Sequence, residues 1–87
     1  MNSSSSIINS YLDERNKNRF NNLLSDESDD AFAEKQKSVF FKYAYKLQDG
    51  GFLDLAQAML ELLQAESREL NIEQEEMGVI RGDLYDN

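Results

Sequence analysis

The sequence predicts an all-α fold, in which a helical hairpin packs with an N-terminal helix as a three-helix bundle or as a dimeric helical assembly. The 87-residue chain contains no Pro, the residue that most strongly breaks helices. Its apolar residues recur at intervals of three and four, as they do on one face of a helix. No segment alternates apolar and polar residues cleanly, so strands are not expected.

The first helix is expected over about residues 6–24, after a flexible N-terminus over residues 1–5. Ser5 or Ser6 can cap its start. Its apolar residues form two stripes that point in different directions, which are Ile7, Ile8, Tyr11 and Leu12, and then Phe20, Leu23 and Leu24. One straight helix cannot bury both stripes against one flat surface, so we expect a break or bend near residues 16–18.

A second helix is expected over residues 29–48, with Asp29 and Asp30 able to cap its start. Most of its apolar residues share one face, namely Phe32, Ala33, Val39, Phe40, Tyr43, Ala44 and Leu47. Phe41 and Tyr45 lie about 100° to one side of that face and one helical turn apart. This aromatic pair is a candidate protein-binding surface. The alternatives are packing under the N-terminal helix and, with the nearby lysines, a platform on which nucleic-acid bases stack.

The two glycines at residues 50–51 are expected to end the second helix, because Gly readily adopts the left-handed conformation of a helix C-cap. A third helix is then expected over residues 52–77, ending at Gly78. The short connection predicts that the second and third helices pack as an antiparallel hairpin. Residues 6–78 would form a single helical domain, and residues 79–87 a C-terminal tail.

The apolar residues of the third helix cover about half of its circumference, which is more than one neighbouring helix can cover. The second helix is one neighbour, and the other must be the N-terminal helix, a second copy of the chain or a different protein. A fully buried Leu or Phe contributes about 1.5–3 kcal/mol, so leaving several of them exposed is costly. The residues of this helix expected to contact a partner are Leu55, Met59 and Leu62.

The excess negative charge lies in the C-terminal half of the chain. The net charge is −8, and residues 1–48 carry seven basic and seven acidic groups, whereas residues 49–87 carry two basic and ten acidic groups. Such a field repels nucleic-acid phosphates and attracts basic surfaces. We therefore expect a protein partner with a basic surface and no direct nucleic-acid binding. A solvated helix face is the alternative role for the acidic residues expected to steer this partner, namely Glu66, Glu73, Glu75 and Glu76.

Two further segments invite a functional interpretation. Residues 26–30 are rich in Asp and Glu, but a calcium loop starting at Asp26 would need Gly and Glu where Ala31 and Lys37 stand. Helix capping and a solvated linker explain this run better. The apolar residues of the tail either fold back on the bundle or dock in a partner, and Leu84 and Tyr85 are the candidates.

The residue types exclude most catalytic chemistry. The chain has no Cys and no His, so no disulfide, thiolate ligand or nucleophile–base pair of the usual kind can form. We expect no enzyme activity, no metal and no cofactor. No signal peptide and no apolar stretch of membrane-spanning length is recognised, which predicts a cytoplasmic protein, or one inside a viral particle, and no membrane partner.

These observations predict a small acidic accessory, adaptor or inhibitor protein that binds another protein through exposed apolar helix surface, with homo-oligomer formation as one option. A first alternative is a structural subunit that fills a seam in a large assembly, such as a virion. A second is an acidic mimic of nucleic acid that blocks a DNA- or RNA-binding protein.

Overall fold

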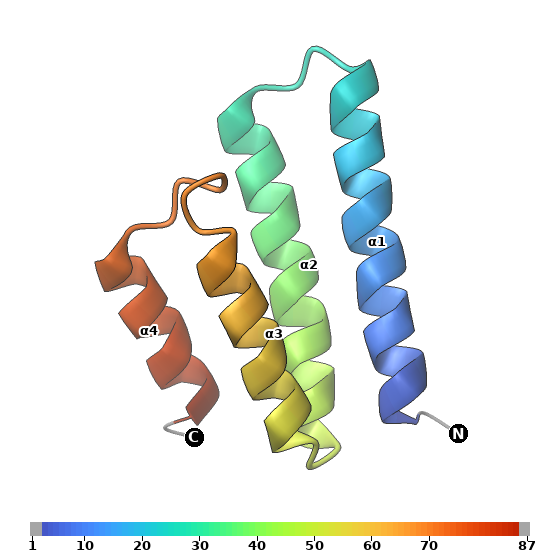
Figure 1. The fold of residues 1–87 in the computed structure, drawn as a ribbon, viewed down its shortest axis with the longest axis vertical. Coiled ribbons are helices and arrows are strands. Elements are labelled where there is room, and N and C mark those ends of the chain that lie inside the picture. Colours follow the sequence, from blue (N-terminus) through green and yellow to red (C-terminus); the bar gives the residue numbers. More distant parts are fainter. Residues whose placement is uncertain (1–2, 86–87) are drawn as a thin grey trace.

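The computed structural model describes residues 3–85, which form helices connected by short turns and contain no strand (Figure 1). The predicted all-α fold is confirmed. The helices are α1 (Ser4–Leu24), α2 (Asp29–Asp49), α3 (Leu53–Ala65) and α4 (Gln74–Tyr85). Consecutive helices run in opposite directions, so α1 and α3 are roughly parallel to each other, as are α2 and α4 (Figure 1).

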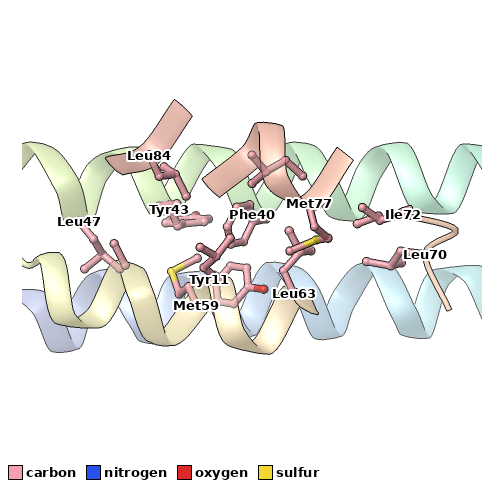
Figure 2. Packing of buried hydrophobic residues seen from close by; sticks show 14 of the residues in the cluster. Tyr11, Phe40, Tyr43, Leu47, Met59, Leu63, Leu70, Ile72, Met77 and Leu84 are labelled. Carbon is pink, nitrogen blue, oxygen red and sulfur yellow. The ribbon is translucent and has the colours of Figure 1, made fainter. Parts of the chain in front are cut away.

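The second helix, α2, is the common neighbour of the other three. Each of α1, α3 and α4 packs against α2. Its inward side chains Phe40, Ala44 and Leu47 have no exposed surface at all. Figure 2 shows Phe40 and Leu47 in one apolar core with Tyr11 of α1, Met59 of α3, and Met77 and Leu84 of α4. The amphipathic pattern of α2 therefore determines where the other helices lie.

Serine side chains begin the first two helices. Ser3 and Ser28 each accept a hydrogen bond of 3.2 Å from the backbone N–H three residues later. The caps expected at residues 5–6 and at residues 29–30 are therefore wrong, because the chain offers a serine slightly earlier in both places. Residues 4–5 are helical rather than flexible, and residues 1–2 lie outside the described part of the chain.

The first helix is continuous, so the break predicted near residues 16–18 is wrong. The prediction assumed that both apolar stripes are buried. In the structure only Ile7 and Tyr11 of this helix are buried, and the stripe around Phe20 faces water. Because only one stripe faces a neighbour, the helix has no reason to bend.

The two glycines end the second helix, as predicted. Gly51 has a left-handed backbone, with φ of +83°. The N–H of Phe52 donates to the carbonyl of Leu47 at 2.8 Å, and that of Gly51 donates to Gln48 at 3.0 Å. These two bonds form a Schellman motif, which satisfies carbonyls at the helix end and returns the chain for the α2–α3 hairpin.

The predicted third helix over residues 52–77 is wrong, because the chain turns after α3 and starts a fourth helix. Asn71 has a φ of 55°, and the N–H of Ile72 donates to the carbonyl of Ser67 at 2.8 Å. This turn repeats the geometry of the glycine turn with Asn in the left-handed position, which Asn tolerates better than most residues. Leu70 and Ile72 are buried on either side of it.

The predicted tail is also wrong as far as residue 85, because it forms most of α4. Gly78 lies inside this helix instead of ending it, while Ile80 and Leu84 are buried in the core. Residues 86–87 lie outside the described part of the chain. The tail thus folds back on the bundle, which was one of its two predicted roles.

The wide apolar surface of α3 is covered from within the chain. On one flank, Ile8 and Tyr11 of α1 line a small depression together with Met59 and Leu62. On the other flank, Tyr85 of α4 lies beside the polar edge of α3. The second neighbour predicted for this helix is therefore supplied by α1 and α4.

Replacing the turn glycine, Gly51, and the helix glycine, Gly78, by alanine should change the free energy of unfolding in opposite directions. Gly51→Ala should lower the free energy of unfolding by about 1–2 kcal/mol, because a side chain is strained in the left-handed region. Gly78→Ala should raise it by about 0.5–1 kcal/mol, since the glycine is helical and an added Cβ has no atom within 4 Å. Urea denaturation measures both values, and destabilisation by Gly78→Ala would contradict a helix over residues 74–85.

Candidate protein-binding surfaces

Among residues 3–85, the most exposed apolar surface is at the end of α1. Phe20, Leu23 and Leu24 have exposed fractions of 62%, 78% and 74%. Their spacing places them on one helix face. We call these three residues the α1 end patch. Because α1 lies at the edge of the molecule (Figure 1), no other helix covers this face.

The inner side of the same helix segment is polar. The Asn18 amide donates to the Gln36 side chain at 3.1 Å, and Gln36 donates to the carbonyl of Arg15 at 3.3 Å. Gln36 is buried in α2, so these bonds satisfy its polar atoms. Further along, Asn22 donates to Glu27 at 3.4 Å. This half of α1 therefore has the reverse of the usual pattern, with amides facing its neighbour and large apolar groups facing water.

Three carboxylates without ion-pair partners in the described residues follow the α1 end patch along the chain. Asp26 follows the helix in the connecting loop, and Asp29 and Asp30 begin α2. Among residues 3–85, none of the three has an ion-pair partner, whereas Glu27 pairs with Lys35. The last turn of α1 contains no basic residue to compensate the negative end of its helix dipole. The end of α1 therefore adds to the negative charge of Asp26, whereas Asp29 and Asp30 face the positive end of the α2 dipole.

The predicted aromatic pair does come together on α2. The rings of Phe41 and Tyr45 stack with centroids 5.9 Å apart and planes 21° from parallel. Phe41 also packs edge-on against the buried Phe40, with centroids 5.4 Å apart, so it supports the core. Tyr45 is 38% exposed. This pair is a real surface feature, but it offers a partner much less area than the α1 end patch.

The aromatic pair lies on the side of α2 that faces α4. The Nζ of Lys37 is 3.0 Å from the Glu76 carboxylate, and the Gln48 amide donates to the carbonyl of Leu84 at 2.8 Å. These two bonds lie on either side of the pair along the helix. The aromatic pair therefore does not pack under α1, which was a predicted alternative. The carboxylates of Glu34 and Glu76 raise the pKa of Lys37, so this bond between α2 and α4 persists at neutral pH.

The partner-contact residues predicted on α3 are divided by the structure. Met59 is only 3% exposed and belongs to the core, so its prediction as a contact residue is wrong. Leu55 and Leu62 are half-buried and pack against the core. The depression beside Leu62 has a volume of about 130 Å³, which is too small for a typical small-molecule site. The depression is small because α1 already covers this flank of α3.

The predicted tail residues are divided in the same way. Leu84 is buried and fills the core beside α2, so it is not a contact residue in this conformation. Tyr85 is 40% exposed and lies beside Gln57, Glu61 and Arg81. Partial burial raises the pKa of its hydroxyl, and Arg81 offsets part of this effect. Tyr85 remains available to a partner.

Two of the four predicted steering carboxylates are bound within the chain. Glu66 forms ion pairs with Arg15 and Arg19 of α1 and has only 11% of its side chain exposed. Glu76 pairs with Lys37, as described above. Glu73 and Glu75 are exposed, and neither has an ion-pair partner in the described part of the chain. Glu66 therefore holds α1 to the turn after α3. Of the four predicted carboxylates, only Glu73 and Glu75 remain free to steer a partner.

Neither a metal-binding cluster nor a membrane-spanning helix is found among the described residues. No group of three or more acidic side chains among them is arranged to hold a metal ion. None of their helices is both long enough and apolar enough to span a lipid bilayer. No known protein family, curated protein or solved structure matches the chain. The functional argument therefore rests on the surface itself.

The α1 end patch was not among the predicted contact residues, although its signal is present in the sequence. The stripe of Phe20, Leu23 and Leu24 was recognised, but it was interpreted as a reason for α1 to bend. The deciding signal is the polar character of the opposite face, where Asn18 and Asn22 stand at positions that should be apolar in a buried helix face.

The ion pairs of Glu66 should contribute more to stability than the neighbouring, more exposed ion pair of Glu69. Glu66→Gln leaves the partly buried Arg15 without its counterion, and should lower the free energy of unfolding by about 1–2 kcal/mol. Glu69→Gln is the matched control, because Glu69 pairs with Arg19 but is half exposed, and its loss should cost less than about 1 kcal/mol. Equal effects in chemical denaturation would contradict a structural role for Glu66.

Proposed function

We propose that the protein is a small interaction module without catalytic activity, and that it binds a protein partner through the α1 end patch. The observation that carries this proposal is the reversed pattern of residues 15–24, in which Phe20, Leu23 and Leu24 face water while amides face α2. Monomers seldom expose contiguous large apolar groups without an interaction role. We propose that it acts in the cytoplasm or inside a particle assembled there.

The patch has the size of an interface anchor. Fully burying one Leu or Phe side chain is worth about 1.5–3 kcal/mol, so three side chains that are mostly exposed offer on the order of 5 kcal/mol. A micromolar complex needs about 8 kcal/mol, after the costs of association are met. The patch would therefore act as the hot spot, and contacts around its rim would supply the remainder.

The aromatic pair is the weaker surface of the two. Phe41 is held against the core, and Tyr45 alone presents substantial exposed area. Catalysis finds no support in the residue types, because the chain lacks the His and Cys that most nucleophile–base pairs require. The proposal therefore assigns affinity to the α1 end patch and at most a supporting role to Tyr45.

Affinity capture from the native source, with identification by mass spectrometry, tests this proposal. The triple variant Phe20→Gln, Leu23→Gln, Leu24→Gln should reduce recovery of the specific partner by at least about tenfold, because hot-spot residues each contribute more than 1 kcal/mol. It should keep the stability of the wild type, since the replaced side chains face water. Purified partner and protein then give the affinity directly by calorimetry.

The matched control carries Leu53→Gln and Val79→Gln, which replace two other exposed apolar side chains, 53% and 63% exposed. This control should capture the partner as the wild type does. Equal capture by the wild type and the triple variant would refute the proposed function, and a loss confined to Phe41→Ala with Tyr45→Ala would move the interface to α2.

A further inference from the structure

We propose that the partner covers the α1 end patch with an amphipathic helix that carries large apolar residues on one face and Lys or Arg along its edge. This inference rests on the proposed function, because it assumes that a protein covers the patch. It specifies that the partner presents an amphipathic helix. It also assigns the electrostatic steering to the charges beside the α1 end patch instead of to the C-terminal acidic residues.

The shape of the patch favours a helix as its partner. Phe20, Leu23 and Leu24 are mostly exposed and form a ridge at intervals of three and four on α1, the helix at the edge of the molecule (Figure 1). Residues at intervals of three and four form the ridges that fit between side chains of a second helix packed alongside. A single extended strand would find no sheet edge here, because the described residues contain no strand. An amphipathic helix therefore matches both the shape and the chemistry of the ridge.

The charges at the rim favour a basic partner. Two carboxylates without ion-pair partners among residues 3–85 lie near the patch, namely Asp13 and Asp26. Asp13 lies on the same outer face of α1, two turns before Phe20, and Asp26 follows Leu24 by two residues. Lys17 is the one basic residue near the ridge that has no such partner in the described range. The rim of the patch is thus negative by one charge on a chain whose net charge is −8, which attracts Lys and Arg and accelerates encounter with them.

The net charge argues against a second copy of this chain as the occupant. A two-fold dimer through the patch would bring together two chains that each carry a net charge of −8. Lys17 of one copy could pair with Asp26 of the other, but the excess negative charge of both chains would stay uncompensated. Repulsion between the two chains opposes the apolar gain, whereas a basic helix is attracted to the chain.

Titration of the full chain with designed peptides tests the inference. The probe is a capped peptide of about five helical turns, with Leu along one face, Lys at its edges and Gln elsewhere. Calorimetry should detect binding at low ionic strength that weakens as salt is added. A scrambled peptide of the same composition keeps the charge but loses the apolar face, and it should bind at least about tenfold more weakly.

Variants of the protein separate the rim from the rest of its acidic surface. Asp13→Asn with Asp26→Asn should weaken binding of the Leu–Lys peptide several-fold, whereas Lys17→Gln should strengthen it, because the rim loses charge of opposite sign in the two cases. None of these positions lies in the first turn of a helix or in the core, so the fold should be kept. Glu73→Gln with Glu75→Gln removes two unpaired carboxylates elsewhere and should change binding little.

Three results would overturn the inference. The first is equal binding of the scrambled and ordered peptides, and the second is equal weakening by the control pair at Glu73 and Glu75. The third is a wild-type dimer in sedimentation that the triple patch variant makes monomeric, which would identify a second copy as the occupant. If capture of a native partner depends on the patch while the Leu–Lys peptide does not bind, the partner class is wrong and the proposed function stands.

Discussion

A straight helix can turn only one face toward its neighbour, and α1 carries apolar residues on two faces. The face with Ile7 and Tyr11 meets α2 and α3 in the core. The other face, with Phe20 at its centre, has nothing against it. Along the second half of α1, hydrogen bonds hold the polar face toward α2, because the buried Gln36 bonds to the Asn18 side chain and to the Arg15 carbonyl. The exposed patch is thus a consequence of how α1 is held.

Most of the apolar surface outside the α1 end patch is covered within the chain, with Leu53 and Val79 as exposed exceptions. The α3 helix has apolar residues over about half its circumference, and α1, α2 and α4 share them. The short turn at Asn71 makes this possible, because it allows α4 to return along α3 and to place Ile80 and Leu84 in the core. The surface without a partner is therefore on α1 and not on the Leu-rich third helix, where the sequence pattern alone had placed it.

The sequence predicts local structure well where a residue type has one usual structural role. Two consecutive glycines after an apolar run predicted the α2–α3 turn, because few residues other than Gly adopt its left-handed conformation without strain. The turn at Asn71 is not predicted because a single Asn also occurs on exposed helix faces, and because Leu70 continues the apolar stripe of the third helix. Helical periodicity places residues on faces, but it does not say which neighbour covers a face, so Met59 and Leu84 were predicted as contact residues and are buried.

The exposure of Phe20 can be measured directly, because the chain contains no Trp and one introduced indole would report on its own surroundings. In Phe20→Trp, the account predicts the emission of a hydrated indole and ready quenching by acrylamide at every protein concentration, followed by a blue shift when the partner is added. Phe32→Trp provides the buried reference, because Phe32 lies in the core. A shielded, blue-shifted emission from Phe20→Trp in the dilute protein alone would contradict the account, since something in the chain itself would then cover the patch.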